Sequence, residues 1–270
     1  MAETRPHRIM YLSPVGDDPV TDPIFADMAR DHKLPGTEVH VTALPKEHYA
    51  FSHIEFRTYE AFVTRGILRA VRAAAEEGFD ALAIGCFYDT ALHDAREISG
   101  NMIVTGPCIA SCEIAASLSN RFGIIVGRRK WVHQMQSTVH AYGHAERLVG
   151  FYDVGLGVDD FQKDHAETNR RLIAAGRRAV EDGAECLILG CTMEIGFYKE
   201  IERELGVPVI DPSIAALKRA EYAAILKRQA GWVPSRKWSC EAPSEAELAA
   251  FNVFAGDEPV FGSRIVIGAE

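Results

Sequence analysis

Two Gly-Cys pairs, Gly85-Cys86 and Gly190-Cys191, each follow a short apolar run with the length of a buried strand. The segments that lead into them are similar: EEGFDALAIGC ends at Cys86 and EDGAECLILGC ends at Cys191, a separation of 191 − 86 = 105 residues. A free thiol has a pKa of about 8.5, so it can serve as an acid or, once deprotonated, as a base near neutral pH. Two equivalent thiols on opposite sides of one ligand suit the inversion of a stereocentre by proton transfer, which needs a base on one face and an acid on the other.

The similarity between the two halves continues beyond the cysteines. At the same offset, Pro107-Cys108-Ile109-Ala110 matches Pro212-Ser213-Ile214-Ala215. A constant offset through a strand, a turn and a later strand indicates an internal repeat. Apolar runs alternate with helical patterns along the chain, and this alternation is typical of βα units with parallel sheets covered by helices.

The pattern predicts eight strands: Arg8–Leu12, Glu38–Leu44, Ala81–Gly85, Met102–Thr105, Gly123–Val126, Arg147–Asp153, Cys186–Gly190 and Val207–Ile210. The clearest predicted helices are Glu55–Glu77 and Asp160–Asp182, with Gly78 and Gly183 as their C-terminal stops. We therefore expect an α/β fold of two similar lobes, each a four-stranded parallel sheet flanked by helices, related by a pseudo-twofold axis. The expected domains are residues 1–111 plus 213–230, residues 112–212, and a C-terminal extension, 231–270, with a short helix at Glu245–Val253 and a strand at Arg264–Ile267.

Each Gly-Cys pair is expected at the carboxyl end of its strand, the edge of an open parallel sheet where ligands bind. If the lobes face each other across a cleft, Cys86 and Cys191 approach one ligand from opposite sides. Backbone N–H groups of the turns can lower a thiol pKa and stabilise a developing enolate oxygen. Cys108 follows a strand and is a candidate for contact with the ligand, whereas Cys112 and Cys186 fit the core and Cys240 lies in the tail.

Composition excludes several classes of function. The chain has 270 residues, 47% of them hydrophobic, and a net charge of -9, which argues against nucleic-acid binding because that needs a basic face. No stretch predicts a signal peptide or a membrane span, so we expect a cytoplasmic protein with reduced thiols. Metal-ligand spacings such as Cys-x-x-Cys are absent, as is a dinucleotide-binding Gly-x-Gly-x-x-Gly after the first strand, so no metal or cofactor is expected. The expected partner is a small-molecule substrate, and a homo-oligomer is compatible with the sequence.

The sequence around the two cysteines resembles the aspartate/glutamate/hydantoin racemase superfamily over about residues 8–228. LILGCTMEI at Leu187–Ile195 looks like the second-cysteine motif, followed by VPVIDPSIAAL at Val207–Leu217. AIGCFYDTAL at Ala83–Leu92 looks like the first-cysteine motif, closest to the hydantoin racemase branch. The resemblance implies two lobes with one catalytic cysteine from each and a metal-free, two-base proton transfer on a hydantoin-like or amino-acid-like substrate.

Some residues depart from the family pattern. Hydantoin-type members carry an Asn-Pro-Asn-like loop after the first strand, where this chain has Ser13-Pro14-Val15-Gly16-Asp17, and Glu194 lies close behind Cys191. The candidate substrate contacts are Ser13, Phe87, Tyr88, Thr192 and Cys108. Two other interpretations stay open: a non-catalytic bilobal ligand-binding protein, and a cysteine-dependent hydrolase or cis–trans isomerase of a related cyclic amide or dicarboxylate.

Overall fold

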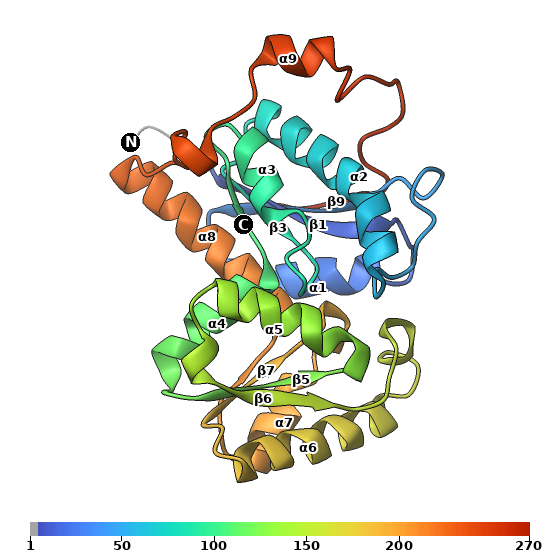
Figure 1. Cartoon of the computed structure of the whole chain (residues 1–270), viewed down its shortest axis with the longest axis vertical. Helices are drawn as coiled ribbons and strands as arrows, with labels where there is room; N and C mark the ends of the chain where they lie inside the picture. Colours follow the sequence, from blue (N-terminus) through green and yellow to red (C-terminus); the bar gives the residue numbers. More distant parts are fainter. Residues whose placement is uncertain (1–4) are drawn as a thin grey trace. The chain divides into compact units, whose positions relative to one another are not determined.

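A computed structural model describes residues 5–270, and the chain divides into two compact α/β units (Figure 1). The first unit contains the residues up to Ile84, Thr90–Thr105 and Leu217–Glu270. The second contains Gly85–Asp89 and Gly106–Ala216. The α/β class and the parallel sheets flanked by helices are confirmed, whereas the pseudo-twofold axis between the halves stays a prediction.

The first unit is built on one five-stranded sheet of order β4-β3-β1-β2-β9, in which β9 alone is antiparallel to its neighbour. In Figure 1, α2 and α3 lie on one face of this sheet and α1 lies on the other. The elements are β1 (His7–Gly16), α1 (Asp22–His32), β2 (Thr37–Leu44), α2 (Arg57–Glu76), β3 (Ala81–Ile84), α3 (Leu92–Ile98), β4 (Ile103–Thr105), α8 (Pro212–Ala230, which begins in the second unit), η5 (Trp238–Cys240), α9 (Glu245–Ala250) and β9 (Arg264–Ile267).

The second unit is built on a four-stranded, fully parallel sheet of order β6-β5-β7-β8. Its helices α4 and α5 lie on one face and α6 and α7 on the other (Figure 1). The elements are α4 (Pro107–Leu118), β5 (Phe122–Val126), η1 (Arg129–Trp131), α5 (Val132–Ala141), η2 (Ala145–Arg147), β6 (Leu148–Asp153), η3 (Val158–Asp160), α6 (His165–Glu181), β7 (Cys186–Leu189), η4 (Thr192–Glu194), α7 (Tyr198–Leu205) and β8 (Val209–Ile210).

The two sheets share one topology, which confirms the repeat seen in the sequence. The first strand of each half, β1 or β5, is central and pairs with the second strand on one side and the third on the other. The fourth strand pairs with the third. Each Gly-Cys pair follows the third strand, so both predicted reactive turns begin at carboxyl strand ends in equivalent places.

The helices follow the predicted periodicity, with one shift at a helix start. In α2, Val63, Ile67 and Val71 form part of the buried stripe, and Gly78, at a φ of +78°, lies just after the helix. The second long helix begins at His165 and not at Asp160, because the side chain of Asp164 accepts a hydrogen bond from the Glu167 amide and caps the helix there.

The C-terminal extension belongs to the first unit. Its strand β9 pairs with β2, from Val39 opposite Ile267 to Thr42 opposite Arg264. The buried Arg69 of α2 donates to the Gly256 and Glu258 carbonyl oxygens and forms a 2.8 Å ion pair with the Glu258 carboxylate. The extension therefore adds a strand to the first sheet and an ion pair between the buried Arg69 and the partly exposed Glu258.

Candidate active site

The turns that carry the two cysteines lie in the same compact unit. The sequence assigned Cys86 to the first lobe and placed the boundary near residue 111, but Gly85–Asp89 and all of α4 group with the second unit. Two contacts explain this grouping. The hydroxyl group of Thr192 donates to the Gly85 carbonyl oxygen at 3.2 Å, and the carboxylate of Asp89 accepts from the amides of α4.

The glycine before Cys191 is required by a close approach between strands. The Gly190 amide donates to the Ile125 carbonyl oxygen of β5 at 2.7 Å. A Cβ atom at residue 190 would lie 2.6 Å from that same oxygen and 2.8 Å from a methyl group of Val126. The absence of a side chain lets β7 stay against β5 up to the residue that bears the thiol.

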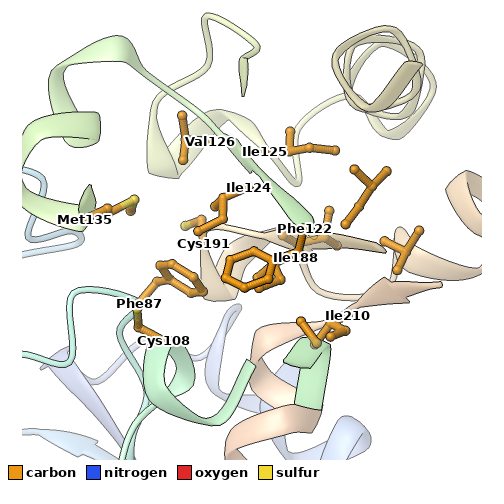
Figure 2. Close-up of a cluster of buried hydrophobic side chains, with 14 of the residues drawn as sticks. Phe87, Cys108, Phe122, Ile124, Ile125, Val126, Met135, Ile188, Cys191 and Ile210 are labelled. Carbon is orange, nitrogen blue, oxygen red and sulfur yellow. The ribbon is translucent and has the colours of Figure 1, made fainter. Parts of the chain in front are cut away.

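The two thiols differ in exposure. Cys86 is half-buried and packs against the hydrophobic cluster of the second unit, whereas Cys191 is 8% exposed and belongs to that cluster (Figure 2). None of the six cysteines of the chain forms a disulfide bond. Both thiols are thus held at the border of a packed apolar core, where the side chains that surround them fix their positions.

The predicted substrate contacts differ in where the fold places them. Thr192 lies in η4 directly after Cys191, and Tyr88 lies two residues after Cys86, both largely buried. Phe87 and Cys108 are at most 2% exposed and appear among the cluster side chains in Figure 2, so they present almost no surface to a ligand. Ser13 lies in β1 of the first unit and stays a prediction. The Cys108 thiol is hydrogen-bonded to Cys112 and is buried. Both effects raise the pKa of Cys108 well above its ordinary value, which favours the neutral thiol.

Asp89 holds the Cys86 turn to α4. Its two carboxylate oxygens accept hydrogen bonds from the amides of Cys108 and Ile109, each at 2.9 Å, and from the Tyr142 hydroxyl group at 2.9 Å. The residue has a φ of +51°, the left-handed region that side chains other than glycine rarely adopt. The helix-capping contacts support this strained turn, and sequence reasoning did not assign Asp89 a role.

Glu194 is the residue of the site whose environment the sequence did not reveal. Its side chain is fully buried, and burial raises the pKa of its carboxyl group well above 4.5, although backbone groups of Cys191 and Gly190 favour the charged form. Neither carboxyl oxygen has a hydrogen-bond partner among the described residues. The repeat could have pointed to it, because Glu194 occupies the position equivalent to Asp89 (89 + 105 = 194).

The described residues contain neither a metal-binding cluster nor a membrane-spanning helix. Within residues 5–270, no group of three or more His, Cys, Asp and Glu side chains is arranged to hold a metal ion. In the same part of the chain, no helix combines the length and apolar character needed to cross a membrane.

Comparison with known proteins supports the resemblance drawn from the motifs. Residues 20–220 match the family model described as Asp/Glu/Hydantoin racemase. The hydantoin racemase of Paenarthrobacter aurescens is 33% identical over 245 residues, which cover 89% of this chain and 99% of that protein. The hydantoin racemase of Pseudomonas sp. (strain NS671) is 33% identical over 174 residues, 64% of this chain and 70% of that protein.

A solved structure shares the fold as well as part of the sequence. The allantoin racemase from Klebsiella pneumoniae superposes with a TM-score of 0.79 at 26% identity, covering 88% of this chain and 94% of that one. The family match, the curated relatives and the shared fold agree with the isomerase class predicted from the paired Gly-Cys turns. The chain belongs to the Asp/Glu/hydantoin racemase family.

Proposed function

We propose that this protein is a cofactor-independent racemase or epimerase in which Cys86 and Cys191 exchange protons with opposite faces of a carbon next to a carbonyl group. The observation that carries the proposal is the pairing of the two Gly-Cys turns. They follow equivalent strands of one repeated topology and are joined by the hydrogen bond from Thr192 to Gly85. Family membership gives the reaction class independent support.

The chemistry requires one thiolate and one thiol at the start of each turnover. The thiolate removes the proton from the carbon, and the electron pair of the C–H bond moves onto the neighbouring carbonyl oxygen to give an enolate. The thiol on the other face then gives its proton to the carbon as the enolate collapses. The product has the opposite configuration, and the two cysteines have exchanged roles, so the reverse reaction uses the same groups.

The proposed substrate is a hydantoin-like or amino-acid-like small molecule. Relatives named hydantoin racemase and a fold neighbour named allantoin racemase support a cyclic ureide first. The proposed substrate contacts are Tyr88 and Thr192 in the turns, together with Ser13. Phe87 and Cys108 are buried in the core and are not proposed as direct contacts. We place the reaction in the cytoplasm, which keeps thiols reduced, in agreement with the lack of disulfide bonds.

The test uses 5-substituted hydantoins, allantoin and acidic amino acids in deuterium oxide. We expect the wild-type protein to invert one of these substrates and to replace its α-hydrogen with deuterium without any other change of mass. Cys86→Ser and Cys191→Ser should each abolish racemisation, because a full turnover needs both a donor and an acceptor. Each variant keeps one thiol, so the two variants should exchange the α-hydrogen of opposite enantiomers with little inversion.

Cys240→Ser is the matched control, since Cys240 is a half-buried cysteine of the tail outside both turns. It should racemise at the wild-type rate. Near-normal racemisation by either the Cys86 or the Cys191 variant would show that this cysteine is structural and that the two-thiol mechanism is wrong. A product of different mass would instead favour a hydrolase.

A further inference from the structure

The two halves of the repeat cap equivalent helices, α4 and α8, with residues at different positions. Helices α4 and α8 both begin with proline, at Pro107 and Pro212, and each leaves backbone N–H groups without partners inside the helix. At α8, Asp211 precedes the proline and accepts hydrogen bonds from the amides of Ser213 at 2.9 Å and Ile214 at 3.3 Å. At α4, the equivalent residue is Gly106 (211 − 105 = 106), which has no side chain to do this.

In the first half, the cap comes from the cysteine turn instead. Asp89, three residues after Cys86, reaches the amides of Cys108 and Ile109 at 2.9 Å. A Cβ atom at Gly106 would clash with the Asp89 carboxylate, so this carboxylate occupies the space that a side chain at residue 106 would use. Because it accepts two backbone amides and the Tyr142 hydroxyl group, Asp89 is stabilised as an anion.

In the second half, the equivalent carboxyl group, that of Glu194, does not cap a helix. Asp211 already caps α8 and also accepts the Gly196 amide at 3.0 Å. Glu194, three residues after Cys191, is fully buried and neither of its oxygens has a hydrogen-bond partner among the described residues. Burial disfavours the carboxylate, and the nearby charge of Asp211 adds to this effect. Together they outweigh the backbone groups of Cys191 and Gly190, so the stable form of Glu194 is the uncharged acid.

We propose that Glu194 is a positioning residue of the site, whose uncharged carboxyl group fills the space behind the Cys191 turn without adding a second negative charge beside Asp211. This inference rests on the proposed function. Cys86 precedes an anion and Cys191 precedes a neutral acid at the equivalent place. The two turns therefore differ in the charge of the carboxyl group three residues after each thiol.

Other ionisable groups of the second unit contribute to the surroundings of the two turns, and each is present in the variants used below. The ionisable side chains on the elements next to the turns include Asp211, Cys108, Cys112, Tyr142 and His165, the last in ring contact with Phe197. Because these groups are constant across the variants, a difference between two single substitutions reports the two carboxyl groups at residues 89 and 194.

The test makes the same chemical change, carboxyl to amide, at both equivalent positions. The rate of alkylation of Cys86 and of Cys191 by iodoacetamide is measured against pH in the intact protein, with each site read by peptide mass spectrometry. A unit charge about 6 Å from a thiol at an effective dielectric constant of about 20 moves the titration midpoint by about 2 pH units. Asp89→Asn should lower the midpoint of Cys86 by about 1 to 2 pH units. Glu194→Gln should leave that of Cys191 within a few tenths of a pH unit, since one neutral group replaces another.

Equal shifts at the two positions, or no shift at either, would overturn the proposal. The positioning role has its own test: Glu194→Ala removes the side chain, and kcat should fall at least tenfold below that of Glu194→Gln, whose shape is preserved. Equal kcat values for the two variants would show that the carboxyl group positions nothing. Alkylation of the thiols does not require turnover, so it tests the inference about Glu194 separately from the proposed function. Serine variants that still racemise the substrate would refute the proposed function and would not affect the alkylation result.

Discussion

Glu194→Gln is expected to stabilise the protein increasingly as the pH rises. Burial raises the pKa of Glu194 well above 4.5 in the folded chain, whereas in the unfolded chain the carboxyl group is in water and has its ordinary value. Between these two pKa values the folded state holds one more proton than the unfolded state. The free energy of unfolding therefore falls as pH rises through this window, and the stability present at low pH is lost. Glutamine has no proton to bind and removes this dependence.

The magnitude follows from one proton. A difference of one bound proton changes the free energy of unfolding by about 1.4 kcal/mol per pH unit. At pH values above 4.5 and below the raised pKa, the advantage of Glu194→Gln over wild type should grow by about 1.4 kcal/mol for each pH unit. Asp211, whose pKa is raised by burial to about 6, is present in both proteins and cancels from the difference.

Urea denaturation at several pH values measures this difference. Trp131 is buried in the second unit, whereas Trp232 and Trp238 are exposed. Unfolding of the second unit exposes Trp131 to water, and the resulting change in tryptophan fluorescence reports that unfolding. Glu204→Gln, at an exposed position of α7, is the control for removal of a carboxyl group as such. The quantity of interest is the slope of the stability difference against pH and not its absolute value. A difference that does not change with pH would mean that Glu194 is charged in the folded protein, and the reasoning about its burial would be wrong.

Two further predictions concern packing around the site and the tail. Gly190→Ala should lower the free energy of unfolding, measured by urea denaturation, by about 1 to 3 kcal/mol and should reduce turnover. The reason is that the added methyl group would lie 2.6 Å from the Ile125 carbonyl oxygen. Unchanged stability would contradict the close approach of β7 and β5. Arg69→Ala should cost about 1 to 3 kcal/mol, since it removes two hydrogen bonds from a buried guanidinium group to carbonyl oxygens of the tail. Limited proteolysis should then cut the region after residue 250 faster than in wild type, and an unchanged cleavage rate would show that Arg69 does not hold the tail.

The sequence predicted the strands well because apolar runs bounded by glycine are local features. All eight predicted strands are present, and β9 occupies the predicted Arg264–Ile267. The 105-residue offset also anticipated the shared topology of the two sheets. The start of α6 was missed because competing caps at Asp160 and Asp164 are distinguished only by which side chain reaches an amide.

The division of the chain into units was harder to predict than the strands. The sequence placed the boundary at residue 111, inside α4, whereas the Cys86 turn and all of α4 belong together through Asp89. That contact spans 19 residues and depends on the space left by Gly106, which no periodicity reveals. The charge state of Glu194 was equally hidden, because it depends on which donors surround the carboxyl group after folding.

The unequal surroundings of the two thiols have a defined consequence for a racemase. The two enantiomers of a substrate have equal free energies, so kcat/KM must be the same in both directions whatever the thiols are like. The enzyme forms with Cys86 or with Cys191 as thiolate are unequally populated, because the Asp89 carboxylate follows Cys86 and the neutral Glu194 follows Cys191. The less populated form must then bind or react with its enantiomer correspondingly better. The asymmetry of the repeat should thus appear in kcat and KM separately, with the two directions differing in each while their ratios agree.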